Sequence, residues 1–254
     1  MTAMTESVPR TGVLDRDVAM RLAATEYRRF ADLLRGLAPA DWATPTECPD
    51  WDVRQVAAHT LGMIEMAASV RETIRQNRAA AKRRREHGGV AIDALTGLQV
   101  DERAEMTPSE IMGRIEARRP VAARARRRSP AFVRRRRLPV AQTVGEHEET
   151  WTIGFLTDVI LTCDAWMHRG DICRATGAPL ELTTDHDAVL VADVVAEWAA
   201  RHGEPYSLRL TGPAGGTWSH GVGGPELELD AVEFCRILSG RGTSEGPLAT
   251  AVPF

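Results

Sequence analysis

The sequence is almost without lysine: Lys82 is its only lysine, so arginine supplies nearly all of the 32 basic residues. We attribute this first to genomic base composition and only second to chemistry. Cysteine is also scarce. Cys48, Cys163, Cys173 and Cys235 are scattered and form no CxxC pair. This pattern argues against the disulfide framework of a small secreted domain and suits a reducing, cytoplasmic location.

Long apolar runs are missing, and none approaches the roughly 18 residues that a membrane span needs. The N-terminal letters MTAMTESVPRTGVLDRD contain no apolar core, so we expect a frayed start without a signal peptide. A net charge of −3 gives no overall attraction to nucleic acid. The GxGxxG, Walker and GxSxG patterns are absent, which removes the commonest nucleotide-binding and serine-hydrolase signatures.

Apolar residues at helical spacing predict four main helices. We expect Asp50 to cap the second helix and a Thr107–Glu110 capping box to open the third, which Pro120 ends or kinks. The polar residues 77–106 are expected to form a solvated helix end and a loop. The four predicted helices span residues 15–37, 51–76, 107–120 and 148–176. Their lengths favour a four-helix bundle.

The stretch LTCDAWMHRGDI, which starts at residue 161, is the most informative part of the chain. Asp164 precedes His168 by four residues, so both lie on one helical face, about 6 Å apart. Leu161 and Ile172 share this face and indicate that it points inward. His59 lies on the apolar stripe of the second predicted helix. Buried polar groups of this kind are costly unless they are paired or bind a metal.

His59, Asp164 and His168 are therefore a candidate three-ligand site for Zn²⁺ with an open fourth position. Manganese, iron and nickel fit the same ligand types. Asp171 could orient an imidazole, or it could pair with a nearby arginine, Arg169 or Arg174. The bland alternative is a buried polar network without metal. Glu26 on the first predicted helix also faces inward, either as a core-edge carboxylate or as a support for the site.

Ten arginines crowd the chain between Arg118 and Arg137. This run could be a patch for phosphate or carboxylate groups, or simply a solvated helix end and loop. Phe132 is its only aromatic residue, so the run lacks the stacking platform typical of single-strand nucleic-acid binders. We therefore do not expect nucleic acid as a partner.

After Pro179 the pattern changes to that of a small α+β domain. A helix is expected over residues 185–202, then strands at 206–211, 216–222 and 226–229, a helix at 230–238 and a final strand at 248–254. We thus predict two domains, 12–177 and 178–254.

Two segments, LRGLAPADWATPTECPDWDVRQVAAHTLG and DAWMHRGDICRATGAPL, resemble the mycothiol-dependent maleylpyruvate isomerase family of DinB-like metalloenzymes. The C-terminal FCRILSGRG and LATAVPF are similar to the second domain of the same proteins. The resemblance covers about residues 14–254. It implies a mainly α protein, a DinB-like four-helix bundle followed by a small α+β domain.

The resemblance also implies a divalent metal, usually zinc, held by His59, Asp164 and His168. The characterised isomerases have glutamate where this chain has Asp164, which puts the substrate and the rate in question more than metal binding. The family places an arginine of the second domain near the metal. Arg241 is the first candidate, with Arg236 and then Arg209 as alternatives. Arg241 could equally be an ordinary cation at a helix C-terminus.

The function implied by the resemblance is that of a mycothiol-dependent isomerase or S-transferase that acts on a small electrophilic substrate. Two other functions stay open at this point: a non-enzymatic binding or regulatory protein, and a metal-dependent hydrolase that activates water. The expected partners are mycothiol and a small substrate, without a membrane, in a monomer or homodimer.

Overall fold

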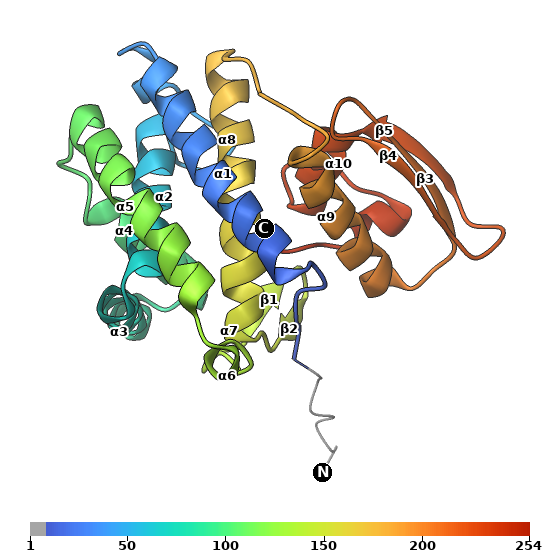
Figure 1. The fold of residues 1–254 in the computed structure, drawn as a ribbon, viewed down its shortest axis with the longest axis horizontal. Helices are drawn as coiled ribbons and strands as arrows, with labels where there is room; N and C mark the ends of the chain where they lie inside the picture. Colours follow the sequence, from blue (N-terminus) through green and yellow to red (C-terminus); the bar gives the residue numbers. More distant parts are fainter. Residues whose placement is uncertain (1–8) are drawn as a thin grey trace.

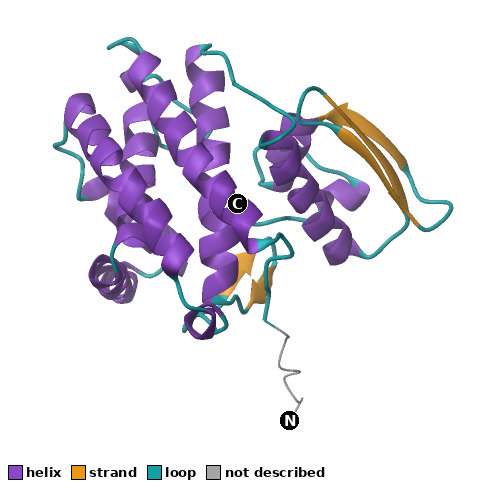
Figure 2. Cartoon of the chain, viewed as in Figure 1, coloured by secondary structure: helices purple, strands orange, loops and turns teal. Residues whose placement is uncertain are grey.

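The structure, a computed structural model, describes residues 9–254. The first eight residues, where a frayed start was expected, lie outside the described residues. A helical bundle and a smaller part with a three-stranded sheet stand beside each other (Figures 1 and 2). Arg10 is already tied to the bundle, because its backbone N–H donates to the carbonyl of Thr150 at 2.9 Å. None of the described helices is long and apolar enough to span a membrane.

Four long helices form the bundle, as predicted (Figure 1). They are α1 (Arg16–Gly36), α2 (Val53–Ala68), α5 (Pro108–Arg128) and α8 (Leu161–Thr176). The core between them is apolar, with Phe30, Leu61, Ile64, Ile111 and Ile172 all fully buried. Burial of this kind supplies most of the stability of a helical bundle.

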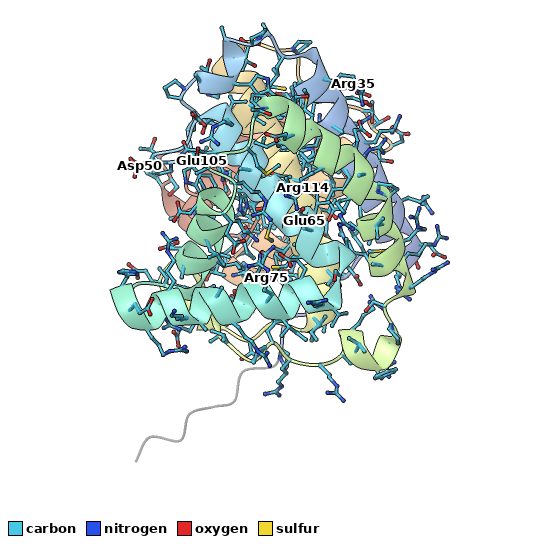
Figure 3. The ribbon with its side chains drawn as sticks, turned by 90° about the vertical axis from the view of Figure 1, so that its left-hand side faces the viewer. Arg35, Asp50, Glu65, Arg75, Glu105 and Arg114 are labelled. Carbon is cyan, nitrogen blue, oxygen red and sulfur yellow. The ribbon has the colours of Figure 1, made fainter. Side chains whose placement is uncertain are left out.

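The second predicted helix is in fact two helices. α2 ends at Ala68 because Ser69 adopts an extended backbone and its hydroxyl caps α3 (Val70–His87) by accepting from the Glu72 N–H. α4 (Ala91–Asp101) follows. The solvated helix end expected within residues 77–106 is present as the end of α3, whereas most of the expected loop is the helix α4. α3 lies across one end of the bundle (Figures 1 and 3).

The cap of α2 is Asp52 and not Asp50. Asp52 accepts from the Gln55 N–H at 2.7 Å, and the Gln55 side chain accepts from the Asp52 N–H, which makes a capping box. Asp50 has a positive φ of 64° in the turn before it. The turn thus places the cap two residues later than composition suggested.

The capping box of α5 is confirmed, with the Thr107 hydroxyl accepting from the Glu110 N–H. Pro120 was expected to end or kink this helix, but α5 continues to Arg128. Buried contacts on both sides of the proline, at Ile115 and Ala122, keep the helix in place. The arginine run continues through the short α6 (Ala131–Arg134) and ends after it, at Arg137.

The run is not uniformly solvated. Arg126 is buried and donates to the Tyr27 hydroxyl at 2.9 Å and to the Thr162 hydroxyl at 2.6 Å. This arginine therefore joins three helices of the bundle instead of facing solvent.

The fourth helix begins later than predicted. Residues 142–149 form a β-hairpin of β1 (Gln142–Val144) and β2 (His147–Glu149), paired antiparallel. The helical segment starts with α7 (Ile153–Phe155), capped by Thr152, and passes through a π-helical turn (Leu156–Ile160) into α8. Pairing with a neighbouring strand thus overrides local helix propensity here.

The C-terminal part contains α9 (Asp187–His202), β3 (Tyr206–Thr211), β4 (Gly216–His220), β5 (Glu226–Asp230) and α10 (Ala231–Leu238). β3 is central, antiparallel to β4 and parallel to β5. The α+β prediction is confirmed. The final strand predicted at residues 248–254 is absent, because residues 246–249 form a 3₁₀ turn and residues 250–254 have no regular secondary structure.

The two parts share a hydrophobic core. Trp166 and Cys163 of α8 pack in one cluster with Trp198 of α9 and Phe234 of α10. Gly177, in the left-handed region at φ 75°, ends α8 where the connection begins. The domain boundary at residues 177 and 178 remains a prediction, since burial is continuous across it.

A buried ion network also crosses this contact. The Arg169 guanidinium on α8 donates to Glu26 of α1 at 2.8 Å and to Asp187 of α9 at 2.8 Å. His186 lies 2.8 Å from the second oxygen of Glu26, and Arg29 donates to Asp187 at 2.6 Å. Glu26 is thus a fully buried ion-pair partner and not a core-edge carboxylate.

We expect Arg169→Met to lower the free energy of unfolding by about 3–5 kcal/mol, because Glu26 and Asp187 would stay buried without this cation. Chemical denaturation measures the loss. Arg174→Met on the same helix is the control, since its exposed contact with Glu47 is worth less than about 1 kcal/mol. Equal losses in the two variants would contradict the network's role.

Stability should also depend on Asp193 of α9. Burial, with the nearby Glu197 carboxylate, raises its pKa to about 6. Between about pH 4 and pH 6, Asp193 is therefore protonated in the native state and ionised in the unfolded chain. The free energy of unfolding consequently falls as the pH rises through that window. Asp193→Asn should match the parent near pH 4 and exceed it by at most about 3 kcal/mol above pH 7. Denaturation curves at both pH values test this, and an equal gain at pH 4 would contradict it.

Candidate metal centre

Helices α2 and α8 bring the three predicted ligand residues together. His59 Nε2 lies 3.3 Å from Asp164 Oδ1, and His168 Nε2 lies 3.5 Å from the same oxygen. The two imidazole rings meet edge to face with centroids 5.0 Å apart. All three side chains are buried or nearly so. One ligand atom from each residue therefore lies within 4.8 Å of the ligand atoms of the other two.

These distances fit a cation better than they fit hydrogen bonds. Ligand atoms around a tetrahedral ion with bonds of about 2.0–2.1 Å are about 3.3–3.4 Å apart. Good N–H···O bonds have donor–acceptor distances near 2.9 Å, so contacts of 3.3 and 3.5 Å are long. Asp164 Oδ2 is also buried without a hydrogen-bond partner among the described residues. A buried carboxylate oxygen without a hydrogen-bond partner is a place where a bound ion or water can supply the contact.

The electrostatics keep Asp164 ionised. Burial by itself raises its pKa, yet the imidazoles of His59 and His168 bring the pKa well below its ordinary value. Burial lowers the pKa of His168, but Asp164 and Asp171 raise it well above its usual range. Because imidazole ligates only when deprotonated, a cation bound here would displace a proton from His168.

Asp171 orients His168. Its Oδ2 lies 2.9 Å from His168 Nδ1, so one of the roles expected for Asp171 is present as a hydrogen bond. Neither Arg169 nor Arg174 is its partner; Arg241 donates to it from Nε at 2.7 Å and from Nη2 at 2.9 Å. Burial raises the pKa of Asp171, but His168 and Arg241 together hold it well below the normal range.

Of the three candidate arginines, only Arg241 reaches this centre. It comes from the segment after α10 and contacts Asp171. Arg236 pairs with Glu47 at 2.6 Å instead. Arg209 lies on the exposed face of β3 beside Glu228. Arg241 is thus more than a cation at a helix end, because it crosses from the C-terminal part to the bundle.

Three further residues at the site were not among the predicted site residues. The Cys48 thiol donates to Asp171 Oδ2 at 3.2 Å, and the Trp51 ring lies 5.2 Å from that of His59. Both belong to the CPDW segment of the loop before α2. This segment is part of the stretch that resembles the isomerase family. Gln99 of α4 lies 2.8 Å from His59 Nδ1. Nothing in the local sequence pointed to Gln99.

A second group of metal-type ligands, Glu26, His186 and Asp187, also lies close together. Its carboxylates are already held by Arg169 and Arg29, so this group is a satisfied ion network.

A surface hollow of about 1070 Å³ lies elsewhere, between the β1–β2 hairpin and α9. None of the candidate ligands lines it.

Fold and site together define a helical bundle with an internal His–Asp–His centre, beside which the α+β C-terminal part packs. The family model described as "Mycothiol maleylpyruvate isomerase N-terminal domain" matches residues 23–173, more than half of the chain. The protein belongs to this family.

Solved structures show the same fold. The crystal structure of a mycothiol-dependent maleylpyruvate isomerase is similar with a TM-score of 0.59 at 15% identity, over 90% of each chain. A histidine-to-alanine mutant of a mycothiol-dependent maleylpyruvate isomerase gives a TM-score of 0.57, also at 15% identity over 90% of each chain. A comparison with curated protein sequences gave no match.

The geometry predicts about one equivalent of bound zinc per chain. His59→Ala, Asp164→Asn and His168→Ala should each weaken zinc binding at least about 100-fold, since loss of a ligand costs more than loss of a supporting hydrogen bond. Calorimetric titration of the metal-free protein measures this. The exposed His220 is the matched control, and His220→Ala should bind as the parent does. Unchanged binding in the three site variants would contradict the assignment.

Proposed function

We propose that this protein is a divalent-metal enzyme that uses mycothiol as a thiol cosubstrate and acts on a small electrophilic substrate, as an isomerase or an S-transferase. Membership of the isomerase family supports an enzyme. The observation that carries the proposal is the buried Oδ2 of Asp164, which has no hydrogen-bond partner in the described part of the chain, while Oδ1 lies between two imidazoles. Mycothiol, the metal and the reaction class are all part of the proposal.

The residues of the centre fit zinc. His59, Asp164 and His168 would hold it through two nitrogens and one oxygen, which leaves a fourth position for a thiol. A divalent ion in this place would supply Lewis acidity and lower the pKa of a coordinated thiol from its free value near 8.5. The shorter Asp164 suffices in place of glutamate, since its Oδ1 already lies within 3.5 Å of both imidazoles.

The protein's own groups would bind and orient the substrate. Arg241 uses Nε and Nη2 to hold Asp171, so its Nη1 is not used in these bonds. A guanidinium fixed in this way can hold a substrate carboxylate and stabilise the negative charge that develops when a thiol adds to a conjugated double bond. Trp51, over both imidazoles, would limit the access of water to this side.

The same chemistry favours the cytosol as its location. All four cysteines are unpaired, and burial raises the pKa of Cys163 and of Cys235. Buried thiols of this kind are inert structural residues. Cys48, the partly exposed one beside the centre, stays free in a reducing compartment.

The proposed function is tested by product analysis with maleylpyruvate and related conjugated acids, with and without mycothiol, on zinc-loaded protein. We expect conversion only with the thiol, and Arg241→Met should lower kcat/KM by about 10²- to 10³-fold while zinc stays bound. Arg209→Met, on the exposed strand, is the control and should keep full activity.

The products separate the competing functions. Isomer or thioether that forms only with mycothiol supports the proposal, and hydrolysis product without thiol would indicate a hydrolase instead. Zinc binding without turnover of any such substrate would favour a binding protein.

A further inference from the structure

His59 has its second ring nitrogen in a chain of buried amides that no catalytic role requires. Nδ1 lies 2.8 Å from Gln99 Oε1, and Gln99 Nε2 donates to Gln76 Oε1 at 2.8 Å. Gln76 Nε2 donates in turn to the Gly62 carbonyl at 3.2 Å and to Glu72 at 2.9 Å. Gln76 and Gln99 are both fully buried.

The direction of this chain is fixed at its far end. The Gly62 carbonyl can only accept a hydrogen bond. Glu72 is ionised, because its hydrogen bond with Arg75 and other contacts lower its pKa to about 2. An ionised carboxylate can only accept. Gln76 must therefore turn its NH₂ toward these two acceptors and its carbonyl oxygen toward Gln99.

The orientation of Gln76 then fixes the orientation of Gln99 and the position of the hydrogen on His59. Gln99 must turn its NH₂ toward Gln76 Oε1, so its carbonyl oxygen faces His59 and can only accept. His59 must consequently carry its hydrogen on Nδ1. When the His59 ring is neutral, its Nε2 is then left with a lone pair on the side of Asp164 and His168, which is the tautomer that a metal ligand needs.

The packing around Gln99 is also shaped for this contact. A Cβ on Gly62 would lie only 2.6 Å from Gln99 Cγ, so glycine is needed where the two helices approach. α3 is anchored by Arg75, which holds Glu72 and Glu102 through four hydrogen bonds of 2.6–2.9 Å. Figure 3 shows Arg75 on α3, which crosses the end of the bundle there.

We infer that Gln99, oriented by Gln76, is a positioning residue that selects the Nδ1–H tautomer of His59 and so prepares Nε2 as a metal ligand. This gives the α3–α4 hairpin, which lies outside the four-helix bundle, a function at the centre. The inference rests on the proposed metal site for its purpose, but the tautomer itself is a property of the metal-free protein.

The test is long-range ¹H–¹⁵N NMR of the metal-free protein at about pH 9, above the ordinary histidine pKa near 6.5. His59→Ala assigns the His59 signals. The parent should show His59 as the Nδ1–H tautomer. Gln99→Met removes the acceptor and should shift His59 toward Nε2–H, and zinc affinity should fall about 10- to 100-fold.

Three further variants separate positioning from packing. Gln99→Glu keeps an acceptor and should restore the Nδ1–H tautomer. Gln76→Met removes the acceptor that orients the Gln99 amide and should give a mixture of the two His59 tautomers. This variant still tests the inference if Gln99→Met does not fold. Met66→Leu removes only a weak sulfur acceptor 3.8 Å from Gln99 Nε2 and leaves the Gln76 acceptor in place, so it should behave as the parent.

An Nε2–H tautomer in the parent, or an unchanged tautomer in both Gln99→Met and Gln76→Met, would overturn the inference. If the parent does not bind zinc, the proposed function fails, whereas the NMR result still decides the role of Gln99.

Discussion

Helix α8 is buried on both sides, and the polar groups that it carries need partners there. One side packs against the bundle core through Ala165 and Ile172, and the other packs against the C-terminal part through Trp166. Burying a charged or hydrogen-bonding group without a partner costs several kcal/mol. The arrangement of the surrounding elements follows from this constraint.

Each polar group of α8 takes its partner from a different element. Arg169 finds Glu26 on α1 and Asp187 on α9. Asp171 is held by Arg241, which comes from the segment after α10. The closure of the C-terminal part against the bundle is therefore both a hydrophobic contact and an electrostatic one. The same contact brings the only nearby guanidinium of the three candidates to the edge of the centre.

Asp164 is the one member of this series whose partners are incomplete. Its Oδ1 lies between two imidazoles at distances long for hydrogen bonds, and its Oδ2 has no partner among the described residues. Arg169 and Asp171 are paired by charged groups of other elements, whereas Asp164 keeps one oxygen for the cation that we propose. The neighbouring group of Glu26, His186 and Asp187 differs from Asp164 in this respect, because arginines already pair with its carboxylates.

The sequence by itself determined the helical bundle, the small α+β part and the inward direction of His59, Asp164 and His168, because helical periodicity reports which residues share a face. It also determined the hydrogen-bond cap at Thr107, which is local. It could not show the division of residues 51–87 into two helices, since a single serine and its backbone geometry decide that break. It also could not show the hairpin before α7, which exists through pairing.

Only the tertiary structure decided which distant residues meet. Gln99 lies 40 positions from His59, and Arg241 lies 70 positions from Asp171, so no local pattern encodes either contact. The same is true of Asp164 Oδ2, whose lack of a hydrogen-bond partner within residues 9–254 can be seen only in the packed structure. Local sequence determines which face of a helix a side chain occupies. The packing of whole elements determines which residues lie opposite that face, because long-range contacts supply the partners of buried polar groups.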